Sequence, residues 1–176
     1  MPLSPDQPLF QGQFHARRRP HLYPGLSEQY LIDEESKMKD QLKKLTEDYI
    51  SATDALLANR RFGEGMFGMP DSARSSPVHM EYFNAVETAV KEYVSGTPQA
   101  ETTDEAVRFL LTASEEIPCN NLASWMLIAV QNHALPLIPL MSEEKRAEMY
   151  AWFNEHVPRL QRMPVQQKII KALKKR

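Results

Sequence analysis

The chain has a single cysteine among its 176 residues, Cys119, so no disulfide can form within it. A lone cysteine favours a reducing compartment. A nucleophilic cysteine needs a histidine partner to activate it, and none is evident beside Cys119 in the sequence. We therefore interpret Cys119 as a small apolar core residue rather than a reactive thiol.

Long apolar runs are also lacking. The best candidate, LASWMLIAV at 122–130, is about half as long as a membrane helix, which needs roughly 18 residues. The N-terminus has no apolar signal core, and its early prolines would break the amphipathic helix of a mitochondrial presequence. We expect a cytoplasmic protein that does not bind a membrane, with residues 122–130 in a buried core helix.

The common catalytic motifs are missing. The sequence has no Gly-rich phosphate loop, no Gly-x-Ser-x-Gly elbow, no His-Glu-x-x-His helix and no Cys-x-x-Cys pair. Its five histidines are scattered along the chain. We expect no catalysis, no cofactor and no metal ion. An enzyme with an unrecognised site is the least favoured alternative, and it would need a closed polar pocket with perturbed titratable groups.

Acidic residues are absent from the C-terminal 158–176, which carry a net charge of +7. Residues 1–26 carry +2 and residues 27–157 carry −11, so both ends are basic and the middle is acidic. This pattern has three interpretations. In the first, the basic ends bind an anionic partner. In the second, they fold back on the acidic body, and in the third, they drive head-to-tail self-association.

Regular structure is disfavoured at 1–26 by five of the 13 prolines. We expect an extended basic arm there, with polyproline-like stretches. Its aromatic residues argue against a purely disordered tail. We predict that the arm contacts either an acidic protein surface or a phosphate backbone through His15, Arg17, Arg18, Arg19, His21 and Tyr23.

Glycine and proline are absent from Ser27 to Phe62, which predicts one long helix capped by Ser27 and stopped by Gly63. Apolar residues recur at heptad spacing, at Met38, Leu42, Leu45, Tyr49, Ala52 and Leu56. Such a helix would span roughly 54 Å, more than a domain with a radius of gyration near 16 Å can cover. It either breaks near 33–36 or projects toward a partner, which includes self-association.

Residues 63–77 are predicted to form a loop, because glycines and prolines interrupt them. This loop also contains Met66, Phe67 and Met69, an unusual composition for a solvated linker. These side chains either plug the end of the bundle or form an adaptable hydrophobic contact with a partner.

Five further helices are predicted. The first covers 78–95 and stops at Gly96, and the second covers 104–114 with a capping box of Thr102 and Glu105. The third covers 122–134, capped by Asn120 or Asn121, and is apolar nearly all round, which is typical of a central helix. Ser142 caps the fourth, which ends before Pro158, and Pro164 begins the last.

The sequence therefore predicts an all-α bundle of five to six helices, with a long heptad-like first helix preceded by the extended arm. Its organisation is predicted as an arm at 1–26, a helical domain at 27–163 and a basic C-terminal helix at 164–176. A helix-turn-helix at 104–134 is rejected, because its second helix has no Lys or Arg for base or phosphate contacts. The last helix can still contact an anionic partner through Lys168, Lys171, Lys174, Lys175 and Arg176.

These observations favour a non-catalytic binding protein, an assembly subunit or an inhibitor-like accessory factor. It would dock on a larger protein or ribonucleoprotein through its arm, its Met/Phe loop and its basic last helix. The alternative is a nucleic-acid-binding accessory protein that uses its two basic ends, because arginines mixed with aromatic groups suit single-stranded nucleic acid.

Overall fold

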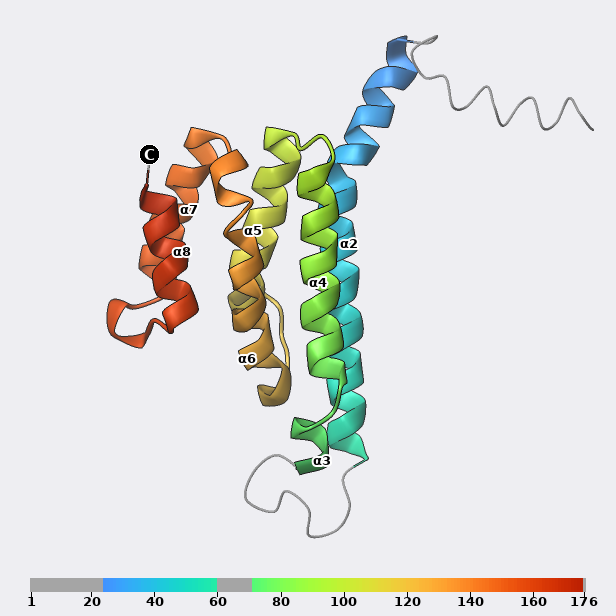
Figure 1. Cartoon of the computed structure of the whole chain (residues 1–176), viewed down its shortest axis with the longest axis vertical. Coiled ribbons are helices and arrows are strands. Elements are labelled where there is room, and N and C mark those ends of the chain that lie inside the picture. The colour runs from blue at the N-terminus through green and yellow to red at the C-terminus, as the bar shows by residue number, and fades with distance from the viewer. Residues whose placement is uncertain (1–23, 60–70, 176) are drawn as a thin grey trace, which may run out of the picture.

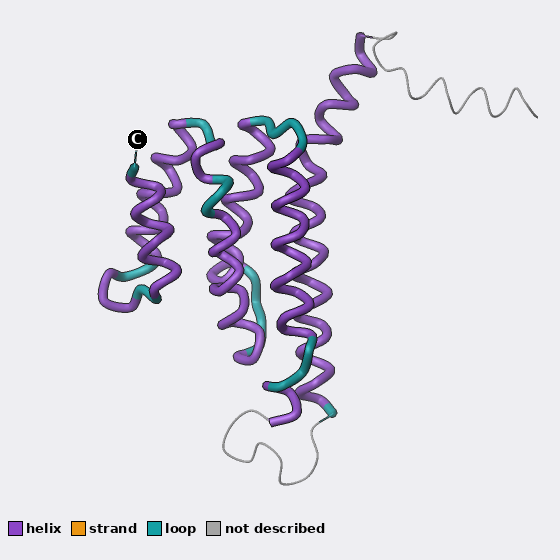
Figure 2. The backbone as a smooth tube through the Cα atoms, viewed as in Figure 1, coloured by secondary structure: helices purple, strands orange, loops and turns teal. Residues whose placement is uncertain are grey.

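The computed structural model describes the backbone of residues 24–59 and 71–175, with side chains from Lys37 to Asn59 and from Ser72 to Lys175. This part of the chain contains six α-helices of nine residues or more and no strand (Figure 2). The six are α2 (Pro24–Ala58), α4 (Val78–Ser95), α5 (Ala100–Glu116), α6 (Asn121–Ala129), α7 (Glu143–His156) and α8 (Pro164–Lys174). The all-α prediction of five to six helices is confirmed.

Shorter helical segments join these six. A single turn, α3 (Asp71–Arg74), precedes α4, so the predicted loop at 63–77 contains a helical turn that its composition did not indicate. Three 3₁₀ segments, η2 (Val130–Ala134), η3 (Ile138–Leu140) and η4 (Arg159–Gln161), connect the later helices. The predicted helix at 122–134 is therefore an α-helix that ends at Ala129 and continues as a 3₁₀ segment.

The helices form three adjacent pairs (Figure 1). Helices α2 and α4 lie side by side along one flank, α5 and α6 lie in the middle, and α7 and α8 form the opposite flank. The core runs between all three pairs, because each contributes side chains that are fully enclosed. Among these are Leu42, Val86, Leu111, Leu127, Phe153 and Ile169.

Helix α2 is continuous from Pro24 to Ala58, so the backbone does not break at 33–36. It begins three residues before Ser27, inside the range predicted for the extended arm, and it ends four residues before Phe62. In Figure 1 its first turns (blue) extend beyond the neighbouring helices and bend away from them. Of the two alternatives for the overlong helix, the structure therefore shows the second: the helix is unbroken and projects beyond the bundle.

The buried stripe of α2 departs from the heptad prediction. Met38, Leu42 and Tyr49 are buried as expected, but Thr46 and Thr53 are also completely buried. Leu45, Ala52 and Leu56 are only half-buried. The threonines can face the core because their hydroxyls donate hydrogen bonds to backbone carbonyls of α2, Thr46 to Leu42 and Thr53 to Ile50.

Most predicted helix ends are confirmed. Asn120 and Ser142 accept hydrogen bonds from backbone N–H groups of the first turns of α6 and α7. Gly96 follows α4, and Pro164 is the first residue of α8. The capping box of Thr102 and Glu105 is wrong, because α5 begins earlier, at Ala100, and Thr102 is buried within its first turn.

Candidate functional site

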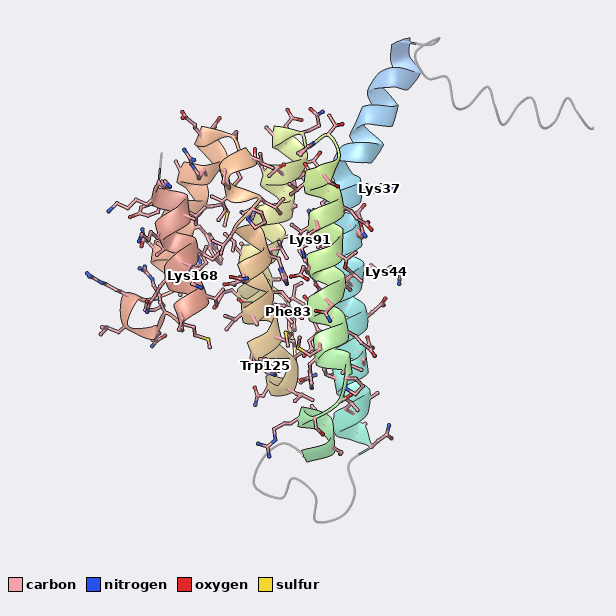
Figure 3. The ribbon with its side chains drawn as sticks, in the orientation of Figure 1. Lys37, Lys44, Phe83, Lys91, Trp125 and Lys168 are labelled. Atoms are coloured by element: carbon pink, nitrogen blue, oxygen red, sulfur yellow. The ribbon has the colours of Figure 1, made fainter. Side chains whose placement is uncertain are left out.

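A shallow groove of about 310 Å³ opens where α4, α6 and the start of α8 meet. Its lining is almost entirely apolar, with Asn132 as the one amide side chain. The apolar lining residues are Phe83 from α4, Trp125, Ile128 and Ala129 from α6, and Met163, Pro164 and Val165 at the start of α8. Figure 3 shows Phe83 and Trp125 on the same face of the molecule.

Large apolar side chains in this groove remain in contact with solvent. Trp125 is 46% exposed and Met163 is also 46% exposed. Met80, one turn before Phe83 on α4, is 54% exposed and extends the same apolar surface. Tryptophan is highly buried on average, so a half-exposed tryptophan beside other exposed apolar groups makes this surface a candidate interaction site.

Asn120 positions the helix that carries Trp125. Its side-chain oxygen accepts a hydrogen bond from the backbone N–H of Ala123 at 2.8 Å, which caps α6. Its side-chain amide donates to Asp54 Oδ1 at 2.6 Å and to Thr53 Oγ1 at 2.8 Å, both on α2. The first turn of α6 is therefore fixed to the long helix, and Trp125 follows one turn later.

A hydrogen-bonded network lies beneath Trp125. The ring of His79 lies 5.7 Å from the ring of Trp125, measured between centroids. Nε2 of His79 lies 2.8 Å from the carbonyl oxygen of Ala73, and Nδ1 lies 2.7 Å from the hydroxyl of Tyr49. Because a carbonyl only accepts, Nε2 carries the proton and Nδ1 accepts from Tyr49.

Two stacked tyrosines complete this network. The rings of Tyr49 and Tyr82 lie 4.4 Å apart and are nearly parallel. The hydroxyl of Thr46 donates to the Leu42 carbonyl, so it accepts from the hydroxyl of Tyr82, 2.9 Å away. Burial raises the pKa of both tyrosines, that of Tyr82 to about 12. Both hydroxyls therefore stay protonated and keep donating, which ties α2 to α4.

His133 supports the other wall of the groove. Its ring is buried and lies 4.4 Å from the ring of Phe83, between centroids. Burial lowers the pKa of His133, and the nearby Glu87 acts in the opposite direction. In the described part of the chain, Nε2 of His133 has no hydrogen-bond partner. A neutral imidazole therefore packs as a largely apolar ring behind Phe83.

Charged residues stand at the rim. Lys91 and Glu87 of α4 form an ion pair at 3.6 Å. Lys168 of α8 follows Val165 by three residues and so lies one turn beyond the groove lining. Lys171, Lys174 and Lys175 continue along the exposed side of α8, opposite the buried Ile169 and Leu173. Among the described residues, none of these four lysines forms an ion pair or a side-chain hydrogen bond with the protein.

The structure places four of the predicted contact residues together. Lys168, Lys171, Lys174 and Lys175 are all exposed on α8, which packs through its other side on α7 and η2. The remaining predicted contact residues lie outside the described residues. They are His15, Arg17, Arg18, Arg19, His21 and Tyr23 of the arm, Met66, Phe67 and Met69 of the loop, and Arg176.

The sequence interpretation missed the groove residues. Helix α6 was expected to be central because it is apolar nearly all round, and Leu122, Met126 and Leu127 are indeed buried. Trp125 faces outward, however, and Ile128 is only half-buried. The available signal was a helix without charge on any side. That pattern indicates burial and a binding surface equally well, so the neighbouring helices had to be known.

Other kinds of functional site find less support among the described residues. A hollow of about 710 Å³, larger than the groove, is an open trough of mixed polarity between α2, α4 and the start of α5. No three His, Cys, Asp or Glu side chains of this part of the chain converge as metal ligands. Burial raises the pKa of the Cys119 thiol, and Asp54 adds to the effect, so the thiol stays protonated.

Comparison with protein-family models, with curated proteins and with solved structures gives no match for this chain. Within the described residues, no helix has the combination of length and apolar character needed to cross a bilayer.

Proposed function

We propose that this chain is a non-catalytic helical binding protein, an assembly subunit or accessory factor that docks on a larger assembly through the groove between α4, α6 and α8. The observation that carries this proposal is the half-exposed Trp125 in an open apolar groove, beside the hydrogen-bonded ring of His79. Exposed tryptophans in preformed apolar sites dominate the energetics of many protein interfaces. The basic arm and the loop with Met66, Phe67 and Met69 belong to the same proposal as additional contacts.

The lining favours a protein segment over a small metabolite. Sites for small molecules combine an apolar lining with several convergent polar groups that fix the ligand. This groove offers the Asn132 side chain alone at its edge. A helix that inserts two or three apolar side chains needs no more than that, because its backbone hydrogen bonds are already satisfied.

The rim favours an acidic segment. The α8 lysines have no acidic partner in the described part of the chain, and Lys168 stands directly beyond the groove. A partner helix with apolar side chains on one face and carboxylates toward α8 would match both features. The lysines would mainly steer and orient this helix, because exposed ion pairs contribute about 0–1 kcal/mol each.

Site-specific crosslinking in cells tests the proposal. A photo-crosslinking amino acid replaces Trp125 in one variant and Leu160 in a control; Leu160 is 99% exposed but lies outside the groove, on η4. We expect position 125 to capture one defined helical segment, rich in acids, that position 160 does not capture. Equal capture at both positions would contradict a binding groove.

Nucleic acid is the second candidate, and the observation that favours it is the set of four lysines at the end of the chain that form no ion pair with the described residues. A nucleic-acid partner would be lost on nuclease treatment and would bind less tightly as salt rises. It would also depend on Lys168 and Lys171 more than on Trp125 and Phe83. Nuclease-treated samples and a salt series in the same experiment therefore separate the two candidates.

A further inference from the structure

The chain contains a segment with the properties that the groove selects, residues 24–36 at the start of α2. This segment has the acids Glu28, Asp33, Glu34 and Glu35 and no basic residue, so its net charge is −4. It also has apolar residues, of which Leu31 lies seven residues before Met38 and continues the register of the buried stripe of α2. In this register Leu31 has Glu28, Glu34 and Glu35 three or four residues away on either side.

The segment projects from its own bundle. Figure 1 shows the first turns of α2 beyond the ends of the neighbouring helices and bent away from them. Most helical stability in proteins comes from packing an apolar face against another element. A helical extension whose backbone runs beyond the neighbouring helices would therefore gain stability from a partner that packs on it.

The groove and the projecting segment cannot meet within one chain. Trp125 lies at the level of His79, which is hydrogen-bonded to Tyr49 of α2. Residues 24–36 precede Tyr49 by 13 to 25 residues, which places them roughly 20–37 Å away along the helix. Figure 3 agrees, with Lys37 and Trp125 near opposite ends of the bundle. Because α2 is continuous, the segment cannot fold back to the groove.

We propose that the groove of one copy binds residues 24–36 of a second copy, with Leu31 against Trp125 and Phe83 and the glutamates facing Lys168 and Lys171. This inference rests on the proposed function of the groove and names its occupant. The contact is head-to-tail, so each copy still offers one free groove and one free segment. Association of this kind closes into a ring or continues as a chain of copies.

Sedimentation and light scattering over a concentration series measure the association. We expect the full chain to form concentration-dependent oligomers. Trp125→Ala in the groove and Leu31→Asp in the segment should each weaken association about tenfold or more, the usual effect of losing a central interface anchor. Leu160→Ala, at an exposed apolar residue outside the groove, should leave the association unchanged. A chain that stays monomeric at all concentrations would overturn the inference.

Charge exchange tests the orientation. Glu34→Lys with Glu35→Lys should weaken association, and so should Lys168→Glu with Lys171→Glu. An equimolar mixture of the two variants should associate again, because the segment of one then complements the groove of the other. The pair Glu47→Lys and Glu155→Lys, an equal charge change at exposed residues elsewhere, should have no effect. Failure of the mixture to associate would contradict the predicted contact.

A crosslink separates this inference from the proposed function. A copy with a photo-crosslinker at position 125 is mixed with an isotope-labelled copy, and the crosslinked peptide is identified by mass spectrometry. A labelled peptide from 24–36 supports the second copy as occupant. A crosslink to a different protein in the cell, with no crosslink between copies, would overturn this inference and leave the docking function of the groove intact.

Discussion

Tyr49 of α2 donates a hydrogen bond to Nδ1 of His79 at the start of α4, and the two atoms lie 2.7 Å apart. This bond joins elements that are 30 residues apart in sequence. Nε2 of His79 in turn donates to the Ala73 carbonyl of α3. One imidazole therefore fixes α2, α3 and α4 relative to each other, and the ring of Trp125 rests beside it.

Removing the Tyr49 hydroxyl should destabilise the fold measurably. In Tyr49→Phe, Nδ1 of the buried His79 loses its hydrogen-bond partner, while Nε2 keeps its bond to the Ala73 carbonyl. An unsatisfied buried polar atom costs about 1–3 kcal/mol. We expect a loss of this size in the free energy of unfolding, measured with urea by circular dichroism.

Tyr82→Phe is the matched control for this prediction. It removes the hydroxyl of the other stacked tyrosine. Thr46 then keeps its hydrogen bond to the Leu42 carbonyl and loses only the hydrogen bond that it accepted from Tyr82. We expect a smaller loss, about 1 kcal/mol or less. A Tyr82→Phe variant that is less stable than Tyr49→Phe would contradict the assigned donor and acceptor roles.

Loss of the Asn120 side-chain oxygen and replacement of its side-chain amide should each destabilise the fold. Asn120→Ala removes the α6 cap and both bonds to α2, and the loss of a cap alone is worth about 0.5–2 kcal/mol. Asn120→Asp keeps the capping oxygen, but it places a carboxylate where the amide lies 2.6 Å from Asp54. Both variants should lower the melting temperature.

The pH dependence separates the two Asn120 variants. The penalty of Asn120→Asp comes from repulsion between two carboxylates, so it should shrink as acid protonates them. The penalty of Asn120→Ala has no such origin and should persist. Melting curves of wild type and both variants at neutral and acidic pH check this, and a parallel response of the two variants would contradict the Asp54 contact.

His133 should make the fold sensitive to acid. Its folded pKa is lowered by burial, so below the ordinary value near 6.5 the unfolded chain takes up a proton that the folded chain resists. The contribution of His133 to the free energy of unfolding is therefore complete above about pH 6.5. It declines as the pH falls, by at most about 1.4 kcal/mol per pH unit. Glu87 opposes the shift of the pKa, and Lys91 and burial favour it.

Denaturation with urea between about pH 7.5 and pH 5.5 measures this effect. In His133→Gln the stability lost on acidification should be smaller than in the wild type. His156→Gln is the control, because His156 is exposed on α7 and hydrogen-bonds to the Trp152 carbonyl. An acid response that is unchanged in His133→Gln but reduced in His156→Gln would contradict the assignment.

Local chemistry in the sequence predicted much of the fold. Asn120 and Ser142 predicted helix starts, Gly96 predicted a helix end, and Pro164 predicted the first turn of α8, because each acts through its own backbone or its nearest neighbours. The capping box at Thr102 and Glu105 failed because tertiary packing overrode the local signal. Thr103 donates to the Gln99 carbonyl and lies 2.8 Å from the hydroxyl of Tyr93, which supports an earlier helix start.

The candidate site was only partly accessible in the same way. The lysines of α8 were predicted as a contact surface, and the structure places Lys168, Lys171, Lys174 and Lys175 on its exposed side. Trp125 and Phe83 were not predicted, because exposure of an apolar residue depends on which helices cover it. Which helices cover a residue is decided by contacts between segments far apart in sequence, and no local sequence pattern encodes those contacts.

The sequence by itself determined the helical class, most helix ends, the basic C-terminal helix and the acidic body, since composition and short-range hydrogen bonding decide these properties. The tertiary structure alone decided that α2 continues past the bundle, that His79 joins three helices, and that α6 leaves Trp125 open beside α8. The physical reason is that burial is a property of the assembled bundle: the same apolar helix is core on the side that meets α5 and exposed on the side that carries Trp125.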